Sequence, residues 1–294
     1  MAQVNSLRGV TLATTSRDIQ MRFYSELWGL TPVVYSSANS TRWLRARGSE
    51  PWVLGFTDAA RNGLERLRLG AASNAAVIAL HARALAAGCP VLTEPAPLEG
   101  PGAYFGFLLH DPDGRIVEIS ATEQHAARTD LDTPLPLRMS HVVLNSPDTR
   151  RTLAFYLDIL GFQISDWYEN DAIVFLRCNE DHHCLGIGQG SNTAINHMAF
   201  LVDDEAAVLA ASERAKAAGV PQIWGAGRHG PGGNVFSYFR DPANFVCEYT
   251  AELIQIEPDQ VWNAKEWKRT PQNANVWGTG GPTPEAIRLM SGEF

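Results

Sequence analysis

Three residues that can bind a metal interrupt apolar stretches in the second half of the chain. His141 stands in the segment Met-Ser-His-Val-Val-Leu, His197 in Ile-Asn-His-Met-Ala-Phe, and Glu248 in Phe-Val-Cys-Glu-Tyr-Thr. A buried polar group without a partner costs roughly 1–3 kcal/mol, so each side chain must be hydrogen-bonded, ion-paired or metal-bound. One such histidine is most often a satisfied core residue. Two imidazoles and a carboxylate on corresponding strands form the facial triad that binds non-haem Fe(II), so the set of three predicts a metal site.

An internal repeat predicts the elements that position these residues. Residues 7–30 and 139–162 share a pattern of strand, polar turn and amphipathic helix. Farther along, residues 111–118 recur as residues 241–248 at nearly the same offset. In the second half we expect strands at residues 141–144, 173–178, 185–188, 197–202, 234–240 and 245–250, and helices at 151–159 and 204–218.

The repeat predicts an α+β fold of two tandem domains. Each domain would consist of two paired βαβββ modules, because one module cannot close a core and two can form a curved, barrel-like mixed sheet around a cavity. We expect an N-terminal metal-free domain at 1–125, a C-terminal metal-binding domain at 136–258, and an extended tail at 259–294 that packs on the body. The polar segment 122–136 would link the domains.

The first half is an internal control for the metal site. By the repeat offset, Gly9 stands where His141 stands, and Arg66 stands where His197 stands; only Glu118 matches Glu248. Arginine cannot lose its proton to ligate a metal. The fold therefore does not require the histidines, which favours a functional role for them.

Composition excludes several classes of partner. The net charge is −8 and the pI is near 5.5. We therefore expect no nucleic-acid binding, which needs a basic stripe, and no membrane association. The N-terminus has no charged and apolar leader pattern, so we expect a cytoplasmic protein. A small-molecule ligand remains open.

Further histidines and a tyrosine extend the pattern. A strand-like segment at 175–181 leads to the pair His182 and His183, and Gly227-Arg228-His229 is followed by Tyr238 and then Glu248. With these residues in this order, nearly the whole chain resembles the type I extradiol ring-cleaving dioxygenases of the vicinal oxygen chelate superfamily. That family includes dihydroxybiphenyl and catechol 2,3-dioxygenases.

The resemblance implies extradiol (meta) cleavage of a catechol-type substrate by O2 at a mononuclear Fe(II), with Mn(II) as the alternative ion. It implies that His141, His197 and Glu248 bind the metal. It also implies that His183 is the acid–base catalyst, and that His183, His229 and Tyr238 contact the substrate. The family is commonly multimeric, so a homo-oligomer is expected.

Several alternatives stay open. His182 could replace His183, and as a residue in a turn it would otherwise lie at the surface. The loop 230–233, Gly-Pro-Gly-Gly, lacks the polar residues of many biphenyl-type members and is closer to a catechol-type branch, so the ring substituent is not determined. Another enzyme of the superfamily, such as a glyoxalase-like lyase or isomerase or a hydroquinone-cleaving dioxygenase, remains possible, as does a non-catalytic small-molecule-binding protein of this fold.

Overall fold

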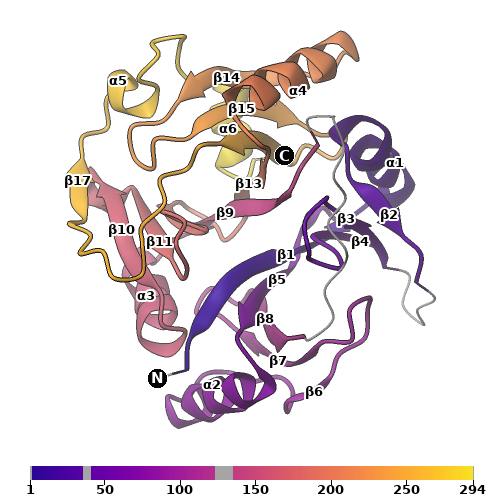
Figure 1. The fold of residues 1–294 in the computed structure, drawn as a ribbon, viewed down its shortest axis with the longest axis vertical. Coiled ribbons are helices and arrows are strands. Elements are labelled where there is room, and N and C mark those ends of the chain that lie inside the picture. Colours follow the sequence, from indigo (N-terminus) through magenta and orange to yellow (C-terminus); the bar gives the residue numbers. More distant parts are fainter. Residues whose placement is uncertain (1, 36–40, 123–134, 294) are drawn as a thin grey trace.

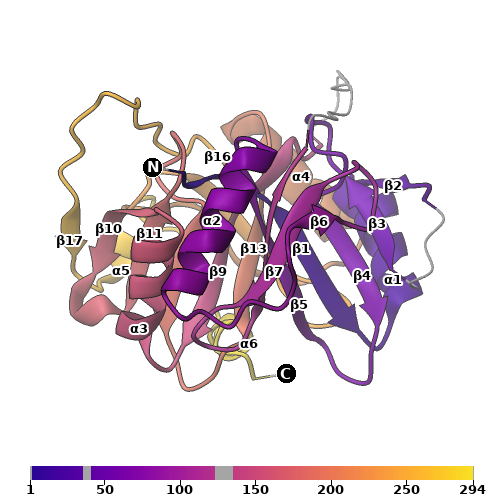
Figure 2. The ribbon, with the colours of Figure 1, turned by 90° about the horizontal axis from the view of Figure 1, so that it is seen from below.

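Two mixed β-sheets lie side by side in a computed structural model that describes residues 2–35, 41–122 and 135–293 (Figures 1 and 2). The strands of the first sheet are β1 Val4–Thr14, β2 Thr31–Val33, β3 Arg42–Arg45, β4 Leu54–Asp58, β5 Gly63–Ala71, β6 Ala96–Pro97, β7 Phe105–His110 and β8 Ile116–Ala121. Those of the second are β9 Arg138–Ser146, β10 Gln163–Tyr168, β11 Ile173–Arg177, β12 Leu185–Gln189, β13 Ile195–Leu201, β14 Gln222–Arg228, β15 Val235–Arg240, β16 Val246–Ala251 and β17 Lys265–Trp267. The helices are α1 Arg17–Arg22, η1 Phe23–Trp28, α2 Asn74–Ala86, α3 Thr149–Ala154, η2 Phe155–Ile159, η3 Glu169–Asp171, α4 Glu205–Ala217, α5 Pro271–Ala274 and α6 Pro284–Met290.

Each sheet consists of two βαβββ modules, which confirms the predicted fold class. The first sheet has the order β2-β3-β4-β1-β5-β8-β7-β6, and the second has the order β14-β15-β16-β13-β9-β12-β11-β10-β17. In each sheet the first strands of the two modules pair antiparallel at the centre, β1 with β5 and β9 with β13. The centre of the second sheet is therefore where both modules present equivalent residues to each other.

The predicted elements of the second half are all present, but two strands were missed. The helix predicted at 151–159 is α3 continued by η2, and the helix predicted at 204–218 is α4. Strands β10 and β14 were not predicted. Strand β14 reads Gln-Ile-Trp-Gly-Ala-Gly-Arg, where two glycines interrupt the apolar alternation that marks a strand.

The tail is more structured than the extended segment that we expected. Strand β17 adds in parallel to the edge strand β10, and the short helices α5 and α6 follow it. Helix α6 packs near β13, β14 and β16 of the second sheet, so the tail does pack on the body. Most of the predicted linker, 123–134, lies outside the described residues.

The two halves are joined by reciprocal hydrogen bonds that explain part of the sequence repeat. Tyr24 of the first half donates its hydroxyl proton to Asp241 of the second, at 3.0 Å. Tyr156 of the second half donates to Asp111 of the first, at 3.2 Å. Helix α2 likewise contacts η2, and helix α4 contacts η1, across the same boundary. Each aspartate thus binds the tyrosine of the opposite half.

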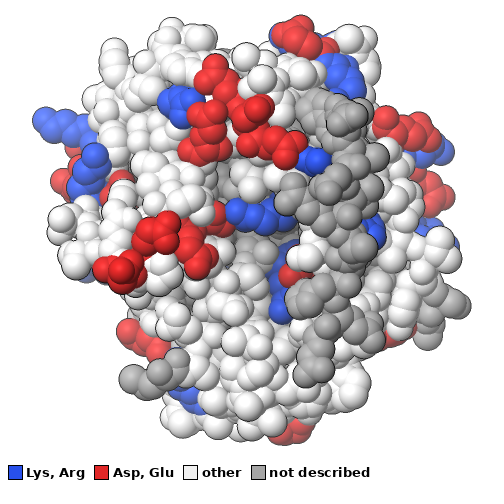
Figure 3. Space-filling model, in the orientation of Figure 1, with Lys and Arg blue, Asp and Glu red and all other residues white. Residues whose placement is uncertain are grey.

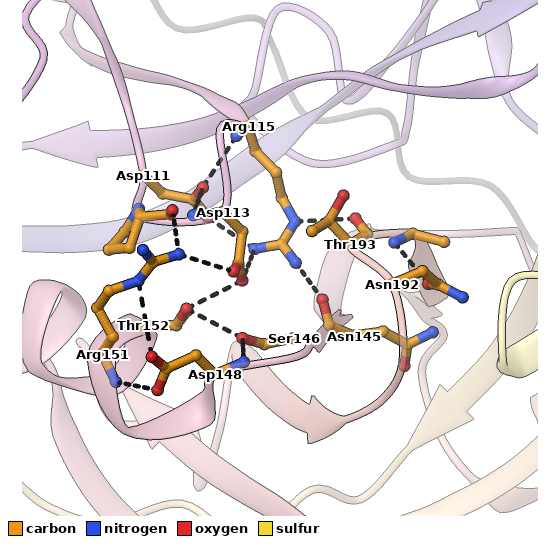
Figure 4. A network of polar contacts seen from close by, with 12 residues as sticks. Asp111, Asp113, Arg115, Asn145, Ser146, Asp148, Arg151, Thr152, Asn192 and Thr193 are labelled. Carbon is orange, nitrogen blue, oxygen red and sulfur yellow. Dashed lines mark hydrogen bonds and ion pairs between the residues drawn. The ribbon is translucent and has the colours of Figure 1, made fainter.

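The two aspartates differ in what balances their charge. Asp111 accepts a hydrogen bond from the Arg115 guanidinium at 2.7 Å, and Arg115 also reaches Asp113 and the main-chain oxygens of Asn145 and Thr193 (Figure 4). In the second half the residue four after the aspartate is Phe245 rather than an arginine. Burial therefore raises the pKa of Asp241 to about 7, although hydrogen bonds from Gln20 and Tyr24 oppose this.

In the described residues, no helix is long and apolar enough to cross a membrane. On the face shown in Figure 3, Lys and Arg side chains lie singly or in small groups among Asp and Glu side chains.

We predict that Asp241→Asn makes stability less sensitive to pH. Between about pH 4 and 7 the native Asp241 holds a proton that the unfolded chain releases, so wild-type stability falls as pH rises through this window. The stability of the variant relative to wild type should therefore rise across this window, by up to about 4 kcal/mol. Urea unfolding at pH 5 and pH 8 measures the difference.

Asp111→Asn is the matched control. Because it removes one of the two carboxylates that balance the buried Arg115 guanidinium, it should lower stability at pH 8. Equal pH slopes for wild type and Asp241→Asn would contradict the account of this interface.

Candidate active site

Three strands at the centre of the second sheet carry the residues predicted to bind a metal. His141 lies on β9, His197 on the adjacent β13, and Glu248 on β16 beyond it. Nε2 of His141 lies 3.1 Å, and Nε2 of His197 lies 3.5 Å, from Oε2 of Glu248. Two ligands bound at about 2.1 Å and at right angles around one ion lie about 3 Å apart. The three side chains thus form a donor set that fits one metal ion.

A chain of amides orients the His197 ring. Nδ1 of His197 lies 2.8 Å from Oδ1 of Asn196, so this nitrogen carries the proton and donates it to the amide oxygen. Asn196 in turn donates to Asn145 at 3.1 Å, and Asn145 donates to the Met290 carbonyl of α6 at 2.8 Å. Nε2 of His197 is buried and has no hydrogen-bond partner among the described residues. Its lone pair is therefore available to a metal.

The electrostatics of the site favour the protonation states that bind metals. Burial lowers the pKa of His197 to about 3, so its imidazole is neutral. Burial alone would raise the pKa of the fully buried Glu248, but the nearby His141 and His197 lower it below its usual value. A neutral imidazole and a carboxylate are the forms that ligate a metal.

Strand register supports the comparison of the two halves residue by residue. His197 lies opposite Val143 in the second sheet, and Arg66 lies opposite Thr11 in the first. These pairs occupy matching places on the central strands. Gly9 is two pairs farther along, at the place that His141 takes in the second sheet.

The first sheet neutralises its buried carboxylate with arginines. Nη1 of Arg66 and Nε of Arg68 each lie 3.1 Å from the Glu118 carboxylate. Arg68 is fully buried, with its guanidinium carbon 3.5 Å from the centre of the Trp52 ring. The sequence comparison identified Arg66 but missed Arg68, because the repeat alone does not show which side chains converge on Glu118.

One of the four equivalent positions of the second sheet carries no ligand side chain. Ala199, the residue opposite His141, pairs with Glu248 of β16. The counterpart of Ala199 in the other module is Val143, because Val143 lies opposite His197 as Ala199 lies opposite His141. Val143 pairs with Gly186 of β12. Glycine has no side chain to offer, and the Val143 side chain fills the space beside it, so these four positions supply a single carboxylate to the two histidines.

The adjacent histidines of the β11–β12 turn face different surroundings. His183 lines a cavity, and its ring centre lies 4.6 Å from that of His141. His182 packs against Trp262, and its Nε2 lies 3.2 Å from Oδ2 of Asp166. His182 is completely buried, so the surface position expected for it was wrong. Of the two, only His183 reaches the cavity.

His229 and Tyr238 form a pair at another side of the cavity. Nδ1 of His229 lies 2.7 Å from the Ala274 carbonyl oxygen, to which it donates. Its Nε2 therefore accepts the hydrogen bond from the Tyr238 hydroxyl, at 3.0 Å. The indole of Trp224 stacks on Tyr238 with ring centres 5.2 Å apart. Sequence reasoning missed Trp224, which lies on the strand β14 that was not predicted.

The cavity next to the triad has a volume of about 540 Å³, which is within the range of small-molecule sites. Its walls are largely apolar. They include Val143, Ile173, Phe175, Trp224, Ile287 and Met290. The last two belong to α6, so the tail contributes to the cavity in a way that its composition did not indicate.

Comparison with known proteins gives consistent results. A model of the Glyoxalase/Bleomycin resistance protein/Dioxygenase superfamily matches residues 138–249. Metapyrocatechase 2 of Cupriavidus necator is 31% identical over 219 residues, which are 67% of this chain and 67% of that protein.

Solved structures extend the likeness to nearly the whole chain. The Mn(II)-bound glyoxalase from Novosphingobium aromaticivorans is 36% identical, with a TM-score of 0.91 over 97% of this chain and 94% of that one. Homoprotocatechuate 2,3-dioxygenase from Arthrobacter globiformis is 20% identical, with a TM-score of 0.85 over 96% and 90%, and shares the fold. The chain therefore belongs to the extradiol ring-cleaving dioxygenases of the vicinal oxygen chelate superfamily.

Proposed function

We propose that this protein cleaves the ring of a catechol-type substrate next to its diol, using O2 and Fe(II) held by His141, His197 and Glu248. The cavity beside three possible ligands is the observation that carries this proposal: His141 and His197 line it, and Gly186 at the fourth position offers no ligand. A three-ligand set that faces a cavity suits chemistry in which substrate and oxidant share one metal ion. When bound, Fe(II) would supply sites for both diol oxygens and O2 and would relieve the spin mismatch between them.

His183 is proposed to take the proton from a catechol hydroxyl. It lies beside His141 in the cavity wall, and burial lowers its pKa well below the usual value for histidine. The imidazole is therefore neutral, the form in which it can accept a proton. Proton transfer by a well-placed histidine is typically worth about 10²–10⁴-fold in rate.

Tyr238 is proposed to bind the ionised oxygen of the substrate, and His229, whose Nε2 is an acceptor, is proposed to bind the hydroxyl that keeps its proton. The Tyr238 hydroxyl donates to Nε2 of His229 in the structure. A substrate oxyanion would replace that nitrogen as the acceptor and gain a directed hydrogen bond. The apolar cavity walls would exclude water from this bond and thereby strengthen it.

A second candidate function comes from the relative that is named as a glyoxalase. The resemblance implies that glyoxalase sites recruit ligands from both halves or from four side chains. In this chain Arg66 and Arg68 fill the first half's position, and Gly186 leaves the fourth position without a side chain. These features favour the dioxygenase. The Mn(II) in that relative supports Mn(II) as the alternative ion, since the same ligands accept both.

We predict that protein purified without oxygen contains about one Fe(II) or Mn(II) per chain, and that His141→Ala loses it. The rates of oxygen uptake with catechols and of formation of the yellow ring-opened product should both fall. Mutation of a residue that only hydrogen-bonds to a metal ligand costs roughly 10–100-fold, and we expect the loss of a ligand to cost more. Metal analysis and an oxygen electrode measure both. His110→Ala, on β7 of the first sheet, is the control and should keep metal and activity.

An enzyme free of both ions, with His141→Ala unchanged, would refute the proposal. Conversion of a substrate without oxygen uptake would favour the glyoxalase-like candidate instead.

We predict that His183→Ala retains its metal but turns over about 10²–10⁴-fold more slowly, because it lacks the proton acceptor. Single-turnover kinetics with the metal content measured in the same sample test this. Wild-type kcat in the variant would remove His183 from the mechanism and direct attention to Tyr238.

A further inference from the structure

A buried carboxylate stands behind the histidine pair of the β11–β12 turn. Asp166 of β10 is 1% exposed, and its Oδ2 lies 3.2 Å from Nε2 of His182. Nδ1 of His182 lies 3.0 Å from Nδ1 of His183. The three side chains therefore form a continuous path from β10 to the cavity.

The carboxylate is held in its ionised form by the tail. The Trp267 indole nitrogen donates to Oδ2 of Asp166 at 2.7 Å, and the Lys265 backbone nitrogen donates to Oδ1 at 3.0 Å. Burial raises the pKa of Asp166, but the hydrogen bonds from His182 and Trp267 more than offset this and bring it below its usual value. Asp166 therefore acts as an acceptor.

These contacts determine where the protons lie. A bare imidazole nitrogen 3.2 Å from a carboxylate oxygen would repel it, so Nε2 of His182 must carry a proton. With a single proton on the His182 ring, at Nε2, its Nδ1 is bare. Only one proton fits between two nitrogens 3.0 Å apart, so Nδ1 of His183 donates it.

We propose that Asp166 and His182 are positioning residues that hold His183 in the tautomer protonated on Nδ1. Nε2 of His183 is then the basic nitrogen, free for a substrate proton. Within the described residues the His183 ring makes no hydrogen bond other than that to His182. The opposite tautomer would place a proton on Nε2 and could not accept another. A comparable carboxylate that fixes a histidine tautomer in serine proteases is worth about 10⁴-fold in kcat.

This inference rests on the role proposed for His183, and it assigns a supporting role to β17. The strand brings Lys265 and Trp267 to Asp166, so the tail supports the site from behind as well as lining the cavity.

The test is nitrogen NMR of the full chain labelled with ¹⁵N-histidine and loaded with zinc(II), a diamagnetic ion that binds the same ligand types. Signals of the pair are assigned by their loss in His182→Gln and His183→Ala. We expect His182 protonated on Nε2 alone and His183 on Nδ1 alone. Wild-type His183 protonated on Nε2, or His182 protonated on both nitrogens, would overturn the proposal without any variant.

Asp166→Ala tests the cause. It should abolish the single-tautomer signal of His183 and lower kcat by about 10²-fold, with KM changed by less than about threefold. The matched control is Asp181→Ala, since Asp181 is about as buried as Asp166 and directly precedes the histidine pair but pairs with Arg138. The control should lose stability and keep the tautomer. Retention of the tautomer in Asp166→Ala would overturn the proposal.

The NMR readout needs no catechol. The expected tautomers together with absent oxygen uptake would contradict the proposed function alone. Oxygen uptake together with the opposite tautomer would contradict only the positioning role.

Discussion

A carboxylate buried at the centre of each sheet is the constraint on which the rest of the structure depends. Glu118 and Glu248 occupy matching positions, and neither can remain ionised in a dry core without a compensating charge. In the first sheet that charge comes from two side chains of the protein itself, Arg66 and Arg68. The second offers imidazoles, and the neutral His197 leaves a lone pair unused. A bound cation would give the second sheet what the arginines give the first.

Duplication explains how one fold produces both arrangements. Four similar modules place equivalent residues at the centre of each sheet, and the register keeps them in contact whether they are ligands or arginines. Gly186 occupies the position pseudo-symmetric to Glu248, so the second sheet has a carboxylate on one side of the histidines and none on the other. The shared scaffold, whose halves are joined by the reciprocal tyrosine–aspartate contacts, provides the fold, and chemistry resides in a few side chains on it.

The sequence predicted the triad and the fold because both depend on patterns along the chain. The repeat aligned Arg66 with His197 from the sequence alone. Strand β14, which carries Trp224, was missed because two glycines interrupt its apolar alternation. Residues that depend on convergence in space were missed: Arg68, the position without a ligand at Gly186, and Asp166 behind the histidine pair. The part played by α6 was also missed, since the tail has no periodicity that would indicate a docking site. The roles of His183, His229 and Tyr238 stay predictions, although the structure brings all three to one cavity.

The central claim is that Glu248 is balanced by a metal where Glu118 is balanced by arginine. Anomalous diffraction at the iron edge, from crystals grown and loaded with Fe(II) without oxygen, tests it most directly. The account predicts one peak among Nε2 of His141, Nε2 of His197 and the Glu248 carboxylate, and none beside Glu118. A peak in the first sheet, or no peak at the triad of a fully loaded protein, would contradict it.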